Sequence, residues 1–267
     1  MLQLQSRDRQ VLRFLEEHRA ITTQQAINIF FKKDISAYRR LNQLEEAGIL
    51  ESYTKGKNKV YKLTGEVKEM SEHDLLIYDF YSWIYSKGGE VLDFKKNPHY
   101  FKNTLIPDGL FKFILPYEGK KYFCCVLLEV DLNHYTEADK LMTLYPKLYR
   151  EQVLTEYCEK VEFPFVVIAR PTPGIRLQPR EIDVIYSDLK FTNLDRLMLG
   201  WWAGQSAPYI IPFRFASLHH SILFDSQNHT TKPFITLTLL GINLNTINSN
   251  YQLNLTIKSK YKSILDL

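Results

Sequence analysis

Two carboxylates stand at the ends of neighbouring apolar segments of the sequence. Asp108 lies in Pro107-Asp108-Gly109, directly before an apolar run at 110–115, and Glu129 closes the next run, which begins at Tyr122. A carboxylate at the end of a buried strand is costly unless it is paired or binds a metal. If the two runs form a hairpin, Asp108 and Glu129 can share one hard cation, Mg²⁺ or Mn²⁺, because such ions prefer oxygen ligands.

Other roles remain open for the acidic residues of this region. Asp108 is equally suited to a turn, since Pro-Asp-Gly is a favourable turn tripeptide. Asp131, two residues after Glu129, is either a third metal ligand or the cap of the following loop. His73 and Asp79 fit better as surface or packing residues of a helix than as ligands.

A local excess of positive charge marks the first quarter of the chain. The whole protein has a formal charge of +4, whereas residues 1–64 hold twelve Lys and Arg against seven Asp and Glu, a net charge of +5. Such an excess attracts polyanions through the release of their counterions. This segment therefore predicts a polyanionic partner, and double-stranded DNA is one such polyanion.

The spacing of apolar residues in this basic segment predicts three helices and a hairpin. The first helix spans 6–18 with Ser6 as its cap, the second starts at Thr22 or Thr23, and the third runs from Asp34 to Gly48, a glycine typical of a helix end. Strands at 49–53 and 60–63 enclose a basic turn at 55–59. The third helix is expected to turn one set of residues inward and another outward. The inward set is Ile35, Tyr38, Leu41 and Leu44, and the outward set is Ser36, Arg39, Arg40 and Gln43.

The segment Arg39-Arg40-Leu41-Asn42-Gln43-Leu44-Glu45-Glu46-Ala47-Gly48-Ile49-Leu50 resembles the helix end of winged-helix DNA-binding domains. The resemblance implies that the third helix lies in the major groove, where Arg can contact guanine or phosphate and Gln can contact adenine. Lys55, Lys57 and Lys59 of the hairpin would follow the flanking phosphates. The alternative is a solvated basic face on a winged helix that binds another protein.

Downstream, the pattern is that of an α/β unit. A helix is expected at 72–85, stopped by Lys87-Gly88-Gly89, and strands at 90–94, 109–115, 122–130 and 163–169, with a helix of about twenty residues between 137 and 160. The three cysteines, two of them adjacent, are expected to be buried free thiols rather than a metal or disulfide set.

Within this unit the two acids resemble the first two positions of the PD-(D/E)xK nuclease superfamily, whose core is a sheet flanked by helices. The resemblance implies that Asp108 and Glu129, with a lysine, surround a metal that activates water for phosphodiester cleavage. Asp131 stands where that pattern has its lysine. Lys140 or Lys147, on the following helix, is the expected source of the amine, and the alternative is an inactive site on a DNA-binding or dimerising platform.

The ordered set of motifs also resembles the replication-relaxation proteins of plasmids and mobile elements, over roughly residues 5–200. The fragments that carry this resemblance are His73-Asp74-Leu75, Pro107-Asp108-Gly109, Glu129-Val130-Asp131 and Lys147-Leu148-Tyr149, behind the winged helix. It implies a protein of plasmid replication or relaxation that binds an origin-like duplex site, with relaxase-like nicking. The alternative is a non-catalytic initiator or copy-number regulator with a degenerate nuclease fold.

The fold class expected is therefore α+β or α/β, in three parts. Residues 1–66 form the winged helix-turn-helix, 69–205 a restriction-endonuclease-like mixed sheet flanked by helices, and 206–267 a β-rich extension with a strand near 251–257. A run long enough to span a membrane is absent from the sequence, and its charged start does not suit a signal peptide. We expect a cytoplasmic protein, with a homodimer as one arrangement that suits paired DNA half-sites.

Overall fold

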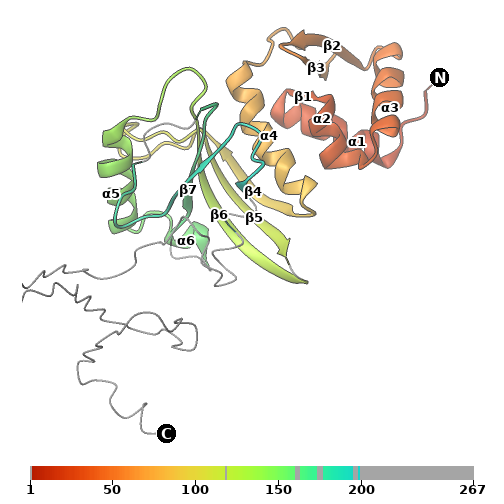
Figure 1. Ribbon diagram of the computed structural model, residues 1–267. Coiled ribbons are helices and arrows are strands. Elements are labelled where there is room, and N and C mark those ends of the chain that lie inside the picture. The colour runs from red at the N-terminus through yellow and green to blue at the C-terminus, as the bar shows by residue number, and fades with distance from the viewer. Residues whose placement is uncertain (1, 118, 160–162, 173–176, 195–197, 199–267) are drawn as a thin grey trace, which may run out of the picture. The chain divides into compact units, whose positions relative to one another are not determined.

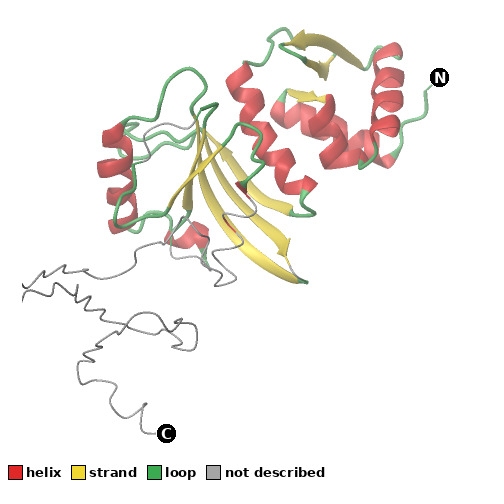
Figure 2. Ribbon diagram, in the orientation of Figure 1, coloured by secondary structure: helices red, strands yellow, loops and turns green. Residues whose placement is uncertain are grey.

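The computed structural model describes residues 2–117, 119–159, 163–172, 177–194 and 198, which all belong to the first of two compact units, residues 1–212. This part of the chain is mixed α/β, with a small antiparallel sheet, a five-stranded mixed sheet and helices around both (Figure 2). The expected extension 206–267, its strand and the Trp201-Trp202 pair lie outside the described residues.

Residues 6–63, called the head below, contain three α-helices, one π-helical turn and three short strands. In chain order they are α1 (Ser6–His18), β1 (Ala20–Thr22), α2 (Thr23–Ala26), the π-helical turn η1 (Ile27–Phe31), α3 (Asp34–Glu46), β2 (Leu50–Lys55) and β3 (Asn58–Leu63). The three helices and the hairpin lie where the sequence predicts them. β1 is an addition: it pairs with β3, which gives the antiparallel order β1-β3-β2.

Local hydrogen bonds explain where the helices of the head begin and end. Thr22 caps α2, because its hydroxyl accepts from the amide of Gln25 at 3.2 Å. α1 is capped by Gln5 rather than Ser6. Gly48 ends α3 with a φ of +70°, and the amides of Gly48 and Ile49 donate back to the carbonyls of Glu45 and Leu44, which is a Schellman motif.

The outward and inward faces of α3 differ from expectation at two positions. Leu41 and Leu44 are fully buried as predicted, but Ile35 and Tyr38 are exposed, by 82% and 51%. Ala37 takes the inward position instead, and it is fully buried. The prediction that Ile35 and Tyr38 face inward is therefore wrong, because Ala37 provides the buried side chain at the start of this helix.

α4 (Glu72–Ser86) joins the head to the larger sheet. Leu75 and Tyr78 pack into the core of the head, whereas Ile77, Phe80 and Trp83 pack against the sheet. Gln25 of α2 is fully buried, and its amide donates to the carbonyl of Leu75 at 2.9 Å. The head is therefore anchored on α4, which the larger sheet also packs against (Figure 1).

The larger sheet has the order β4-β5-β6-β7-β8. Its strands are β4 (Glu90–Lys96), β5 (Gly109–Tyr117), β6 (Lys120–Val130), β7 (Phe165–Ala169) and β8 (Val184–Ser187). β4, β5 and β6 pair antiparallel, while β7 and β8 continue in parallel. The first four strands were expected and β8 was not, because its run of four residues is too short to stand out.

Alternate residues of β6 serve two cores, one on each face of the sheet. Val126 and Leu128 pack with α4, whereas Cys125 and Leu127 pack with the helical segment that follows β6. Figure 1 shows α4 and α5 on opposite sides of the sheet. All three cysteines are buried and free, as expected.

The expected helix between 137 and 160 is interrupted rather than continuous. It consists of the π-helical turn η2 (Lys140–Leu144), α5 (Tyr145–Arg150) and α6 (Thr155–Cys158). Gln152 has a φ of +52°, a left-handed conformation that ends the helical hydrogen-bond pattern. In the part of the chain described here, none of the helices is long and apolar enough to cross a bilayer.

Candidate functional site

The register of β5 and β6 places Asp108 and Glu129 opposite each other. Gly109 pairs with Leu128, so the next position along the ladder opposes Asp108 to Glu129. The amide of Asp108 donates to the carbonyl of Leu128 at 3.0 Å, and a carboxylate oxygen of Asp108 accepts from the amide of Val130 at 2.6 Å. The hairpin predicted from the sequence therefore does bring the two acids to one edge of the sheet.

Glu129 is held by two donors from the helical segment that follows β6. Nζ of Lys140 lies 2.7 Å from Oε1 and 2.8 Å from Oε2 of Glu129, and the hydroxyl of Tyr145 donates to the same carboxylate. Lys140 also donates to the carbonyl of Ile106 at 2.9 Å, in the loop that leads to Asp108. The lysine thus bridges the two segments that carry the acids.

Burial shifts the pKa values of Glu129 and Tyr145. Glu129 is only 4% exposed, and burial raises its pKa to about 7, against the lowering effect of Lys140 and with a further rise from Asp108. Burial and the nearby Glu129 carboxylate raise the pKa of Tyr145 well above its usual value, so this hydroxyl remains a donor. Glu129 is thus a carboxyl that changes charge close to neutral pH.

A histidine from α4 completes the cluster. Nε2 of His73 lies 3.3 Å from a carboxylate oxygen of Asp108. The hydrogen bonds with Asp108 and Asp74 raise the pKa of His73 to about 10, so its imidazole carries a positive charge at neutral pH. The sequence favoured a surface or packing role for His73. Its contact with Asp108 bridges thirty-five positions of sequence, and a local pattern does not encode it.

The residues Asp108, Glu129, Lys140, His73 and Tyr145 are called the carboxylate cluster below. The side chains of Asp108 and Lys140 remain 20% and 21% exposed, so this side of the cluster is open to solvent. Two carboxylates that oppose each other supply hard oxygen donors, and the charge of Asp108 contributes to the raised pKa of Glu129. Carboxylate oxygens are the ligand type that Mg²⁺ and Mn²⁺ prefer.

Two residues proposed from the sequence lie outside the cluster. Lys147 contacts Glu151 at 3.8 Å and stacks over the ring of Phe101, so of the two candidate lysines it is Lys140 that meets Glu129. Asp131 is buried and contacts Arg170 at 2.7 Å, while Thr136 donates to its other oxygen. Its role is that of a loop cap with a buried ion pair. Over the described ranges, no group of three or more His, Cys, Asp or Glu is arranged as a metal site.

A second feature lies on α3. Four residues expected to contact DNA line one hollow of about 350 Å³, together with Arg7 of α1 and Phe31. These four are Ser36, Arg39, Arg40 and Gln43. Their roles differ: Arg39 is exposed, whereas Nε of Arg40 donates to the buried carboxylate of Asp8 at 2.9 Å and its Nη1 donates to Gln43 at 3.0 Å. Arg40 therefore fixes α3 against α1.

The hairpin lysines do not form one surface. Lys57 is exposed at the tip, beside Gly56. Lys59 turns back to α3, where it contacts Glu45 at 2.7 Å. Lys55 lines a separate cleft instead. Of the three, Lys57 presents its charge outward with the fewest constraints.

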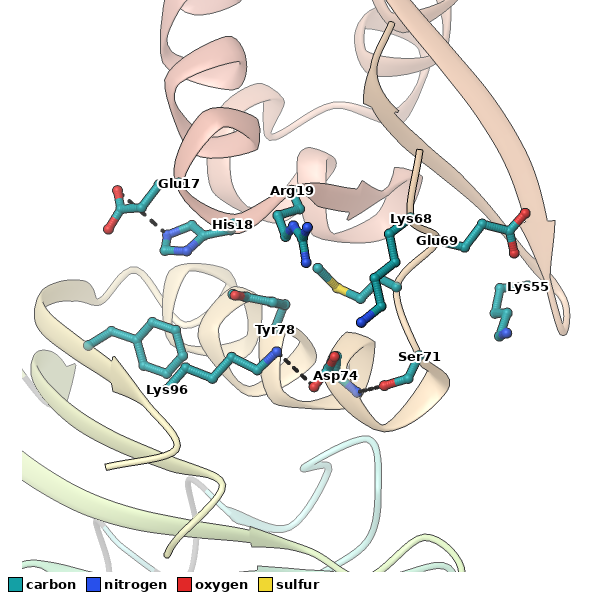
Figure 3. Close-up of a pocket in the computed structure, with 12 residues that line it drawn as sticks. Glu17, His18, Arg19, Lys55, Lys68, Glu69, Ser71, Asp74, Tyr78 and Lys96 are labelled. Atoms are coloured by element: carbon teal, nitrogen blue, oxygen red, sulfur yellow. Dashed lines mark hydrogen bonds and ion pairs between the residues drawn. The ribbon is translucent and has the colours of Figure 1, made fainter. Parts of the chain in front are cut away.

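That cleft, of about 590 Å³, lies between the end of α1, the segment 68–71 and the start of α4 (Figure 3). Its walls carry both signs of charge, with Arg19, Lys68 and Lys96 among the cations and Glu17, Glu69 and Asp74 among the acids. Lys96 is held by Asp74 at 2.8 Å. Because Asp74 follows His73, the cleft adjoins the carboxylate cluster through the first turn of α4.

No protein-family model matches the chain, and no curated protein matches it. The assignment of a function therefore depends on the geometry of the carboxylate cluster and of the head. Two members of the cluster, His73 and Tyr145, were missed from the sequence. Only the packing of α4 and of the segment after β6 against the sheet brings them to the acids.

Proposed function

We propose that this protein is a metal-dependent DNA-nicking protein, in which the head binds duplex DNA and the carboxylate cluster cleaves a phosphodiester bond. The observation that carries the proposal is that Lys140 contacts both Glu129 and the carbonyl of Ile106, two residues before Asp108, and that Asp108 opposes Glu129 along the ladder. Two opposed carboxylates and a lysine are the constituents that the PD-(D/E)xK resemblance implies. The setting that fits the wider resemblance is plasmid replication or mobilisation, at an origin-like site.

Each residue of the cluster would contribute in a different way. Asp108 and Glu129 would hold the cation, and a bound Mg²⁺ or Mn²⁺ would lower the pKa of its water and polarise a phosphoryl oxygen. Lys140, which is partly exposed, would stabilise negative charge that develops on the phosphate. Tyr145 and His73 orient the two carboxylates, because each donates to one of them.

The head supports the choice of DNA as the substrate. The head has three helices and a three-stranded sheet of order β1-β3-β2, in which β2 and β3 form the hairpin. This arrangement supports the winged-helix interpretation, in which α3 enters the major groove. Arg39 on α3 and Lys57 at the hairpin tip are exposed, and Arg7 lines the hollow beside α3. Positive charge at these three positions can contact the phosphates on either side of the groove.

A binding selection followed by a nicking assay tests both parts of the proposal. The full chain is first used to enrich duplexes from a random-sequence pool at low salt, and an enriched site is cloned into a supercoiled plasmid. We expect enrichment and then conversion of that plasmid to the open circle with Mn²⁺ or Mg²⁺. Absence of enrichment would contradict DNA binding, and enrichment without open circles would contradict catalysis.

The Asp108→Asn variant separates the cluster from a contaminating nuclease. It keeps the size and most hydrogen bonds of Asp108 but removes the charge that a cation needs. We expect it to bind the selected duplex as the wild type does and to nick at least a hundred-fold more slowly. Equal nicking by the variant and the wild type would remove the cluster from the reaction.

One observation favours a second function, that of a non-catalytic initiator or regulator of replication. Both carboxylates already have cationic partners within the protein, Lys140 for Glu129 and His73 for Asp108. A site whose charges are balanced in this way can serve as a structural ion-pair network. This alternative predicts site-specific binding to DNA that does not depend on metal, and no strand breaks.

A further inference from the structure

We infer that Ile35 and Tyr38 recognise thymine, by packing against its 5-methyl group in the major groove. The inference rests on the proposed binding of duplex DNA by the head, and it adds a base preference to that proposal. It starts from the exposure of the two side chains, which leaves 82% of Ile35 and 51% of Tyr38 in contact with solvent.

The two residues lie on the same outward stripe of α3. They are three positions apart, which places neighbouring side chains on one face of a helix. The opposite face is formed by Ala37, Leu41 and Leu44, all fully buried. Both residues fall within the first five positions of α3 (Asp34–Glu46), and the first turns of a helix that lies in the groove are the ones that meet base edges.

The charges around this stripe favour nucleic acid as the occupant. Arg39 follows Tyr38 directly and is exposed, and Lys32 and Lys33 lie exposed just before the helix. Asp34, in the first turn of the helix, stabilises the helix through its dipole and is the nearest acid in the sequence. Apolar side chains that are flanked by cations match a surface whose apolar groups are flanked by phosphates.

A second copy of the chain is a poorer match. A two-fold contact centred on Ile35 and Tyr38 would bring Arg39 of one copy towards Arg39 of the other, which is repulsive. Two side chains also provide far less than the ~800 Å² per partner of a stable interface. The thymine methyl is the largest apolar group on the base edges of the major groove, and apolar side chains recognise it by direct contact.

Replacement of thymine by deoxyuridine tests the inference, because it removes only the methyl group and keeps the base pair. Starting from the enriched duplex described above, each thymine is replaced in turn and the Kd of the full chain is measured by fluorescence anisotropy. We expect Kd to rise about four-fold at one or two positions, as for the loss of one buried methyl group. At those positions the Ile35→Ala or the Tyr38→Ala variant should bind thymine and uracil duplexes equally.

The Val67→Ala variant is the matched control, since Val67 is exposed by 93% but lies outside α3. It should keep the full sensitivity of the wild type to uracil. Equal Kd values for thymine and uracil at every position would overturn the inference while DNA binding stands. The same holds if the Ile35→Ala and Tyr38→Ala variants both retain the four-fold effect at every sensitive position, or if Ile35→Ala instead dissociates a dimer. Failure to enrich any duplex would overturn DNA binding itself, and the inference with it.

Discussion

Nζ of Lys140 lies 2.7 Å from Oε1 of Glu129, although the two residues belong to different elements. The contact forms because the chain turns back after β6, so that the first helical turn, η2 (Lys140–Leu144), covers the end of the strand that carries Glu129. The same turn places Nζ of Lys140 2.9 Å from the carbonyl oxygen of Ile106, two residues before Asp108. Lys140 therefore links its own helical turn to the strand that carries Glu129 and to the loop before Asp108.

The Glu129→Gln variant should change how stability depends on pH. Burial raises the pKa of Glu129 to about 7 from an unfolded value of 4.5, so the folded protein binds more protons than the unfolded chain between these pH values. As pH rises through that window, ionisation of this carboxyl lowers the free energy of unfolding, and the loss is complete above pH 7. The Glu129→Gln variant lacks this ionisation. Its free energy of unfolding should therefore rise by about 2 kcal/mol relative to that of the wild type as pH goes from 5 to 8.

Urea unfolding of both proteins at pH 5 and at pH 8 measures this difference. Glu137→Gln is the control, because Glu137 is exposed and close in sequence. Its free energy of unfolding should follow the wild type at both pH values. A Glu129→Gln variant with the same pH dependence as the wild type would show that Glu129 titrates as an ordinary surface acid.

His73 should remain protonated well above neutral pH. The hydrogen bonds with Asp108 and Asp74 raise its pKa to about 10, while burial lowers the pKa of His18 below its usual value. The stabilisation from the His73 contact is complete below pH 6.5 and is lost as pH rises through 10. NMR titration of the histidine ring signals should show one midpoint above 9, which the Asp108→Asn variant lowers. A midpoint near 6.5 for His73 would show that the contact with Asp108 does not persist in solution.

Substitutions of the two adjacent arginines of α3 should have different effects: loss of Arg40 should lower stability, and loss of Arg39 should weaken DNA binding. Arg40→Ala leaves the fully buried Asp8 without its partner, so we expect a loss of about 3 kcal/mol or more in the free energy of unfolding. Arg39→Ala should change stability by less than about 0.5 kcal/mol, because Arg39 is exposed. It should weaken binding to the selected duplex about ten-fold and flatten the salt dependence. The reverse pattern, with Arg39 needed for stability, would contradict the assignment of the two roles.

Local signals in the sequence were enough for most of the fold. Thr22 and Gly48 mark the start of α2 and the end of α3 because each satisfies backbone groups a few residues away. The strand β6 was evident from its nearly continuous apolar run, and the Asp108–Glu129 pairing followed from a hairpin with a short turn. Ile35 and Tyr38 were misplaced because apolar spacing does not distinguish a residue that faces the core from one left exposed.

The rest of the cluster depends on contacts between distant segments. Lys140 and Lys147 are both lysines on the helical stretch after β6, and only the path of the loop at 131–139 decides which one meets Glu129. His73 contacts Asp108 because α4 packs against the sheet that contains β5, and Asp108 directly precedes that strand. Asp131 was ambiguous because its partner, Arg170, follows β7, which pairs with β6 in parallel.

The two lysines offer the most direct test of the proposed DNA cleavage. Lys140→Met and Lys147→Met remove the same charge from neighbouring elements, but only Lys140 contacts Glu129. The measurement is the initial rate at which each variant nicks the plasmid with the selected site, in Mn²⁺, with thermal unfolding as the check on folding. We predict a rate at least a hundred-fold below the wild type for Lys140→Met and an unchanged rate for Lys147→Met. A folded Lys140→Met variant that nicks as fast as Lys147→Met would contradict the account.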